Sequence, residues 1–257
     1  MAIIFPSPIF GPVRSRRLGT SLGINLLPGD GKCCSFDCIY CECGFNGDNV
    51  PEQKLPTRDE VVRALQYHLR KMKEEGPKPD VLTFAGNGEP TLHPQFAEII
   101  DDTLALRDRY FPNAKVSVLT NATQIFRQPV FDALCKVDNN ICKLDTVSPD
   151  YIQLIDRPNG SYDVQKTIAR LKEFGQRCVI QTIFMTGEHK GESADNTGEA
   201  FVQPWLKALQ EILPREVMVY TIDRETPAHG LKKASREVLD SIGEQVRQLG
   251  ILCSVAY

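Results

Sequence analysis

Five of the nine cysteines in this 257-residue sequence lie within eleven positions, at 33, 34, 38, 41 and 43. Three of them, Cys34, Cys38 and Cys41, have the spacing C-x3-C-x2-C. Three thiolates on one short loop can each bind a different iron of a cubane iron–sulfur cluster, which normally takes four cysteines. Using only three leaves one iron open to a ligand that is not protein. The spacing therefore predicts a [4Fe-4S] cluster with one open iron.

Structural zinc is the nearest alternative, because four ligands close a tetrahedron around that metal, usually as two separated C-x2-C pairs. Cys33 or Cys43 could supply the fourth ligand, but one continuous loop would make a cramped tetrahedron, and no distant second pair follows. A third interpretation is a cluster that only carries electrons, which also needs a fourth protein ligand. The roles of Cys33 and Cys43 stay open, as does that of Cys253, which could donate a hydrogen atom.

A second motif whose residue types could bind a ligand is Gly86-Asn87-Gly88-Glu89-Pro90, which directly follows an apolar, β-branched run. Glycines let the end of a strand approach a ligand closely, and a carboxylate there can accept hydrogen bonds from an ammonium group. Taken alone, the motif fits a glycine turn ahead of a helix better than a binding site. The motif lies one strand after the segment that carries the clustered cysteines, residues 33–43, which is called the cysteine segment below. This position favours the binding role.

The elements that must position these residues alternate between apolar runs and amphipathic stretches of helical period. The predicted strands are residues 22–27, 81–85, 115–120, 140–145, 178–184 and 216–221, and the predicted helices include 58–73, 94–110, 164–174, 201–213 and 235–249. Six strand–helix alternations predict an α/β fold, a partial (βα)6 TIM-like barrel of parallel strands with outer helices. The first 20 residues and residues 185–200 look irregular, and residues 251–257 could add one short strand.

Polar residues at the carboxyl ends of these strands are further candidates, because ligands of parallel α/β folds bind there. Asn121 follows the third predicted strand, Lys143 and Asp145 share one face of the fourth, and Gln181 lies on the fifth. Each also has a structural explanation, since Asn121 could cap a helix and Lys143 could pair with Asp145. Residues 220–224, at the end of the sixth strand, are either the edge of a substrate site or an Asp–Arg surface pair.

Composition sets the broad class of the protein. With 42% apolar and 25% charged residues and no linker-like stretch, residues 1–257 are predicted to form a single soluble domain. A net charge of −3 argues against a general nucleic-acid binder. No apolar run approaches the ~18 residues of a membrane span, and the first basic residues follow the first apolar segment, unlike in a signal peptide. We therefore expect a cytoplasmic protein with no membrane segment and reduced thiols.

The segment Cys34-x3-Cys38-x-Tyr40-Cys41, together with the 86–90 motif, resembles the signature of radical S-adenosylmethionine (radical SAM) enzymes. The resemblance implies a [4Fe-4S] cluster on the three cysteines, with its open iron chelated by the methionine part of SAM. It implies an oxidoreductase-type reaction in which reductive cleavage of SAM gives a 5′-deoxyadenosyl radical that abstracts a substrate hydrogen. The cofactors supply this chemistry, and a cluster potential of about −400 mV implies flavodoxin or ferredoxin as electron donor.

The same resemblance assigns the cofactor-binding residues. Tyr40 is implied to lie near the adenine, and Gly86, Asn87, Gly88, Glu89 and Pro90, with Glu89 foremost, to hold the amino group of SAM. Asn121, Lys143, Asp145 and Gln181 are implied to contact the ribose or carboxylate of SAM, or the substrate. No catalytic residue that acts on the substrate is assigned.

The stretches 11–23 and 220–227 resemble a subgroup of small radical SAM proteins that is grouped with wyosine-type tRNA synthases. This resemblance favours a nucleoside or tRNA base as substrate. Arg14, Arg16, Arg17 and Lys32 could form a basic strip near the mouth of the cluster site, or simply a solvated N-terminal face. The tRNA-modifying members carry a second cysteine triad ahead of the first, whereas this chain has no cysteine before Cys33. The alternatives are an activase, a peptide-modifying radical SAM enzyme and a non-enzymatic zinc-binding protein.

Overall fold

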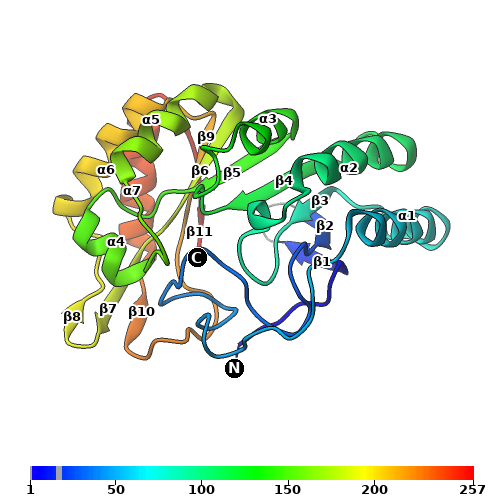
Figure 1. Cartoon of the computed structure of the whole chain (residues 1–257). Helices are drawn as coiled ribbons and strands as arrows, with labels where there is room; N and C mark the ends of the chain where they lie inside the picture. Colours follow the sequence, from blue (N-terminus) through cyan, green and yellow to red (C-terminus); the bar gives the residue numbers. More distant parts are fainter. Residues whose placement is uncertain (1, 16–18) are drawn as a thin grey trace.

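The computed structural model describes residues 2–15 and 19–257, and its framework is a curved sheet flanked by helices (Figure 1). Within that part of the chain, eight strands pair in the order β1-β2-β3-β4-β5-β6-β9-β11. Their bounds are β1 (Ile9–Ser15), β2 (Gly19–Ile24), β3 (Val81–Phe84), β4 (Lys115–Thr120), β5 (Asn139–Lys143), β6 (Cys178–Ile183), β9 (Glu216–Tyr220) and β11 (Leu252–Ala256). All neighbours from β2 to β11 are parallel, whereas β1 runs antiparallel to β2 at one edge.

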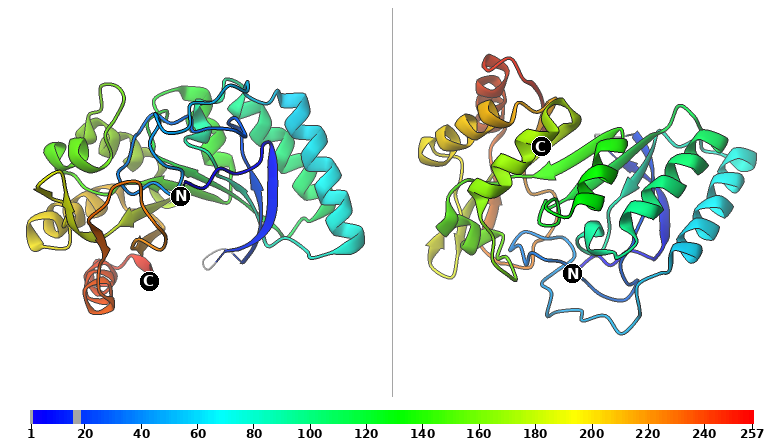
Figure 2. Two further views of the ribbon diagram at one scale, coloured as in Figure 1. Left: turned by 90° about the horizontal axis from the view of Figure 1, so that it is seen from below. Right: turned by 45° about the horizontal axis from the view of Figure 1, so that its top comes forward.

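Helices connect the parallel strands and follow the outer face of the sheet (Figure 2). They are α1 (Arg58–Glu75), α2 (Phe96–Tyr110), α3 (Gln128–Lys136), α4 (Pro149–Ile155), α5 (Val164–Phe174), α6 (Glu199–Ile212) and α7 (Arg236–Gln248), with short 3-10 turns η1 (Pro90–Leu92) and η2 (Gly175–Arg177). Each of the six predicted strands is followed by at least one helix, and residues 251–257 supply β11. The predicted partial (βα)6 barrel is confirmed.

The strand sequences separate a helix-covered face from an inner face, because successive side chains of a strand point to opposite sides. Val118 of β4 and Ile180 of β6 pack into the large core with the helices. Val179 belongs instead to a small apolar cluster of the other face. Lys143, the last residue of β5, and its register partner Gln181 of β6 share that inner face. Polar side chains thus gather where the strands end.

Local sequence signals explain where the helix after the cysteine segment begins. Thr57 caps α1, and its side chain accepts the backbone N–H of Glu60 while the Glu60 carboxylate accepts the backbone N–H of Thr57. Such a capping box satisfies two backbone donors at once and typically contributes about 1 kcal/mol. The cap therefore marks where the loop that carries the cysteines ends and α1 begins.

The prediction that two segments are irregular is wrong. The first 20 residues contain β1, in which a register irregularity falls between Phe10 and Val13, and prolines are tolerated in such edge strands. Residues 185–200 contain β7 (Met185–His189) and β8 (Glu192–Ser193), which form a small sheet with β10 (Leu231–Lys233). β7 pairs with β10, which lies far along the chain, and with β8 in a short hairpin. The polar, glycine-containing sequence of these strands lacks the apolar run that marked the others.

Candidate active site

The cysteine segment lies in the long connection between β2 and α1, over the carboxyl ends of the parallel strands. On one side the turn after β3 holds it, since Cys33 N–H donates to Asn87 O at 2.8 Å and Glu89 N–H donates to Cys33 O at 3.1 Å. On the other side, Ile39 N–H donates to Ile155 O at the end of α4 at 2.9 Å. The segment is therefore anchored to two separate strand–helix units.

Gly88 is the residue that permits the first of these contacts. Its φ is +133°, and a Cβ placed there would lie 1.9 Å from Cys33 O. Only glycine fits at such a close backbone approach. The contact with the cysteine segment therefore requires glycine at position 88 of the 86–90 motif.

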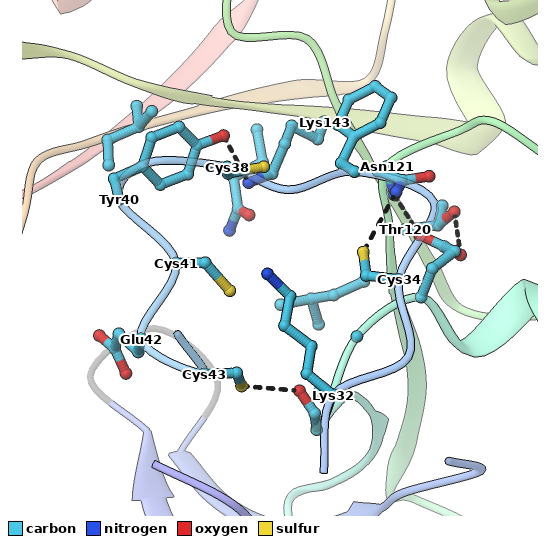
Figure 3. A pocket seen from close by; sticks show the side chains of 18 of the residues that line it. Lys32, Cys34, Cys38, Tyr40, Cys41, Glu42, Cys43, Thr120, Asn121 and Lys143 are labelled. Carbon is cyan, nitrogen blue, oxygen red and sulfur yellow. Dashed lines mark hydrogen bonds between the residues drawn. The ribbon is translucent and has the colours of Figure 1, made fainter. Parts of the chain in front are cut away.

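A cavity of about 340 Å³ opens between the cysteine segment and the strand ends (Figure 3). Cys34, Cys38 and Cys41 line it, and so does Cys43, whereas Cys33 is outside this set. In the described part of the chain, no three His, Cys, Asp or Glu side chains form a ready-made site for a single metal ion. Soft thiolate donors around one cavity fit an iron–sulfur cluster by the chemistry of the donor set.

Three of these thiols have a distinct polar neighbour. Asn121 Nδ2 lies 3.6 Å from Cys34 Sγ, Cys38 Sγ lies 3.7 Å from an oxygen of Asp156, and Cys43 Sγ lies 3.3 Å from Gly86 O.

Burial raises the pKa of Cys34 to about 12 and that of Cys38 well above its usual value. The hydrogen bond from the Cys43 thiol, helped by the charges of Lys32 and Lys143, lowers the pKa of Cys41 against the effect of its burial. Cys41 is therefore the cysteine of the segment whose thiolate form its surroundings favour.

Glu89 is 2% exposed, and protein donors surround its carboxylate. It accepts the backbone N–H of Thr91 at 3.1 Å, the hydroxyl of Thr120 at 2.7 Å and the backbone N–H of Asn121 at 2.6 Å, in addition to the Thr91 hydroxyl. Burial raises its pKa, and these hydrogen bonds act in the opposite direction. A carboxylate held by so many donors has a fixed orientation beside the cavity.

The other residues of the 86–90 motif divide into two groups. Gly86 and Gly88 line the cavity with Glu89. The Asn87 side chain instead accepts from Phe5 N–H at 2.8 Å and donates to Pro28 O at 2.7 Å. Pro90 begins η1. Neither Asn87 nor Pro90 is among the lining residues, so both have structural contacts here.

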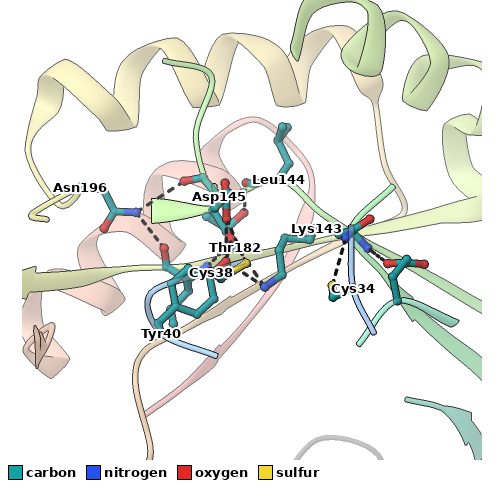
Figure 4. A network of polar contacts seen from close by, with 12 residues as sticks. Cys34, Cys38, Tyr40, Lys143, Leu144, Asp145, Thr182 and Asn196 are labelled. Atoms are coloured by element: carbon teal, nitrogen blue, oxygen red, sulfur yellow. Dashed lines mark hydrogen bonds and ion pairs between the residues drawn. The ribbon is translucent and has the colours of Figure 1, made fainter. Parts of the chain in front are cut away.

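Tyr40 connects the cavity to a buried polar network (Figure 4). Its hydroxyl lies 2.8 Å from an oxygen of Asp156, is hydrogen-bonded to Asp145, and accepts from Lys143 Nζ at 2.9 Å. Lys143 also lies 3.7 Å from Asp145, so the structural pair that the sequence left open exists. Burial and the nearby Asp145 carboxylate raise the pKa of Asp156 well above its usual value. Asp156 is a member of the site that no sequence motif marked.

The remaining predicted residues are brought to the same cavity with one exception. Asn121, Lys143 and Gln181 line it, whereas Asp145 lies behind Tyr40 and is 4% exposed. Residues 220–224 form the far wall. Arg224 donates to the carboxylate of Glu42 at 2.6 Å, which ties this wall to the cysteine segment.

The predicted basic strip near the cavity mouth is wrong for the residues that the structure describes. Lys32 lines the cavity but is 3% exposed, so it adds no basic surface at the mouth. Arg14 pairs with Thr20 in the β1–β2 ladder, at the opposite end of the sheet from the cysteine segment. Arg16 and Arg17 lie outside the described residues. The error came from grouping positions by sequence distance, although the chain runs antiparallel between β1 and β2.

A parallel partial barrel with a three-cysteine loop over its carboxyl edge defines the class of protein. Residues 30–195 match the family model described as the radical SAM superfamily. The chain therefore belongs to the radical SAM superfamily of enzymes. Within it, the chain belongs to the family of the UPF0026 protein slr1464 of Synechocystis, with 32% identity over 240 residues that cover 88% of this chain and 79% of that protein.

Two further similarities concern longer proteins. A protein named GTPase Obg of Brachyspira hyodysenteriae is 30% identical over 90% of this chain, which spans only 32% of that protein. The crystal structure of a radical SAM methyltransferase from Sphaerobacter thermophilus has a TM-score of 0.65 at 16% identity, covering 91% of this chain and 65% of that one. This second likeness supports the fold alone. Among residues 2–15 and 19–257, no helix combines the length and apolar character that crossing a bilayer requires.

Proposed function

We propose that the cavity holds a [4Fe-4S] cluster on Cys34, Cys38 and Cys41 and binds SAM beside it. The observation that carries the proposal is the meeting of three thiols from one loop with the fixed carboxylate of Glu89 in a single cavity. When bound, the cluster and SAM supply the radical chemistry, in which an electron cleaves the S–C5′ bond and the resulting 5′-deoxyadenosyl radical takes a hydrogen atom from the substrate.

The residues of this chain bind and orient the reactants. Glu89 accepts hydrogen bonds from the amino group of SAM, for which its buried, donor-fixed carboxylate is suited. Asn121, Gln181 and Lys143 offer polar groups along the strand ends for the ribose and carboxylate. Tyr40 presents its ring near the adenine while its hydroxyl stays fixed in the carboxylate network. Apolar side chains of Phe36, Ile183 and Ile222 complete the lining of this space.

The substrate, the partners and the location belong to the same proposal. The sequence resemblance to wyosine-type tRNA synthases supports a nucleoside or tRNA base, bound toward the wall formed by residues 220–224, with a peptide or a partner enzyme as the alternative. A flavodoxin or ferredoxin in the cytoplasm would provide the electron. Residues 1–257 would act as one radical SAM domain.

Anaerobic reconstitution with iron and sulfide tests the proposal. The reconstituted protein, mixed with SAM and a strong reductant, should release 5′-deoxyadenosine detectable by mass spectrometry. The variant that combines Cys34→Ala, Cys38→Ala and Cys41→Ala should bind no cluster and release none. Bound zinc without iron or sulfide would overturn the proposal in favour of a zinc-binding protein. A cluster whose EPR spectrum SAM does not perturb would overturn it in favour of an electron carrier.

A further inference from the structure

Lys32 is a buried cation directly ahead of the cysteine segment. Its side chain is 1% exposed, and lysines are almost never fully buried unless they are paired. Its ammonium donates to Gly44 O at 2.7 Å and lies 3.7 Å from the carboxylate of Asp37. Asp37 also faces Arg157 at 3.5 Å and accepts the backbone N–H of Asn46 at 2.6 Å. One distant, shared carboxylate leaves much of the Lys32 charge uncompensated.

The three cysteines are the groups that this charge faces. Lys32 lines the cavity with them, and Figure 3 shows its ammonium directed between the side chains of Cys34 and Cys41. The hydrogen bond to Gly44 O and the ion pair with Asp37 hold the ammonium in this position beside the thiols.

Two other cationic side chains among the described residues line the same cavity, and both have close anionic or polar partners. Lys143 donates to Tyr40 at 2.9 Å and pairs with Asp145. Arg224 is 54% exposed and forms a 2.6 Å bond with Glu42. Solvent and partners screen these two charges. Lys32 combines burial, weak pairing and proximity to the thiols.

We propose that Lys32 sets the reduction potential of the cluster bound by Cys34, Cys38 and Cys41, an inference that rests on the proposed function. Reduction adds one electron, supplied by an external low-potential donor, and leaves the cluster with one more negative charge. A fixed positive charge in a low-dielectric surrounding stabilises the reduced state more than the oxidised state. In this proposal Lys32 acts through the cluster rather than on the substrate.

The test compares substitutions that change the local charge in opposite directions. Lys32→Met removes the positive charge, Lys32→Arg keeps it, and Asp37→Asn removes the neighbouring negative charge. Lys115→Met makes the same change as Lys32→Met at the exposed start of β4, at the other end of the sheet. Each full-length protein is reconstituted anaerobically, its iron and sulfide contents are measured, and its potential is determined by redox titration monitored by EPR.

Lys32→Met should lower the ratio of reduced to oxidised cluster at a given potential at least tenfold, which is a shift of 59 mV for a one-electron couple. Asp37→Asn should shift the potential upward, while Lys32→Arg and Lys115→Met should stay close to wild type. A purely structural role would not give shifts of opposite sign.

A Lys32→Met protein with a full cluster and the wild-type potential would overturn the inference. If this variant loses the cluster, Asp37→Asn decides alone, and the absence of an upward shift overturns the inference. These outcomes differ from failure of the proposed function, in which the wild-type protein itself would bind no cluster or would bind one insensitive to SAM.

Discussion

The backbone N–H of Asn121 donates to the carboxylate of Glu89 at 2.6 Å, across 32 positions of sequence. This bond joins the turn after β3 to the end of β4, and the Thr120 hydroxyl adds a second link to the same carboxylate. Two adjacent strand ends therefore fix the orientation of Glu89 before any ligand arrives. Because the carboxylate is already ordered, no free energy of ligand binding is lost to ordering it.

Glu89→Gln should weaken SAM binding while the cluster remains. Hydrogen bonds to charged groups contribute about 1.5–3 kcal/mol, so the Kd for SAM should rise roughly tenfold to a hundredfold. The variant should also unfold more easily by about 1–3 kcal/mol, because the new amide group faces donors in place of an acceptor. Anaerobic calorimetric titration of the reconstituted protein measures the affinity. Glu211→Gln, an exposed change on α6, is the control, and equal affinity in both variants would contradict the role of Glu89.

Gly88→Ala should displace the cysteine segment. The added Cβ would meet Cys33 O at 1.9 Å, and the φ of +133° disfavours any other residue. We expect a loss of about 1–3 kcal/mol in the free energy of unfolding, typical of overpacking, and a clear fall in iron bound after reconstitution. Gly160→Ala is the matched control, because no atom lies within 4 Å of the position of its Cβ. Wild-type iron content in Gly88→Ala would show that the segment does not depend on this contact.

The framework of the site was predictable because its signals are local. The bounds of β4 match the predicted 115–120, and those of α5 match 164–174. Gln181 and Lys143 could be placed on strands of the sheet from the apolar, β-branched runs alone. Glu89 could be singled out because its glycine turn ends the strand that follows the cysteine segment. Each of these features depends on a few neighbouring residues, which the sequence displays directly.

The features that the sequence did not show depend on contacts between distant segments. The burial of Lys32 runs against the usual exposure of lysine and follows from a loop that folds back onto Gly44. Asp156 reaches Tyr40 across 116 positions, and no motif surrounds it. The contacts of Asn87 with Phe5 and Pro28 likewise cannot be read from a glycine-rich turn. These contacts decide which motif residues face the cavity and which support it.

Cys43→Ser should retain the cluster and its response to SAM. The Cys43 thiol lines the cavity, but the hydrogen bond with Cys41 and burial raise its pKa. Its Sγ also lies 3.3 Å from Gly86 O, a contact that suits a protonated thiol. Iron and sulfide analysis and EPR spectra with and without SAM measure the outcome. Cys33→Ser, outside the lining residues, is the control. Loss of the cluster in Cys43→Ser alone would identify a fourth protein ligand and thereby favour an electron carrier.

Protonation of the buried His93 ring should make the folded state less stable at mildly acidic pH. It is 2% exposed at the C-cap of η1, where its Nδ1 accepts the backbone N–H of Gln95 at 3.1 Å and its Nε2 lies 2.8 Å from Pro56 O. These contacts require the neutral ring with its proton on Nε2. Burial lowers the pKa of His93 below its usual 6.5.

The unfolded chain therefore takes up a proton more readily than the folded chain as the pH falls through about 6.5. The contribution of His93 to stability is full above that pH and is lost progressively below it, down to the lowered pKa of the folded state. Urea unfolding of the cluster-free protein at pH 7.5 and pH 5.5 measures this loss. His93→Gln should reduce the stability at pH 7.5 by about 1–2 kcal/mol through its altered hydrogen bonds and should show a smaller difference between the two pH values. An unchanged pH difference in the variant would mean that the ring of His93 titrates alike in the folded and unfolded chains.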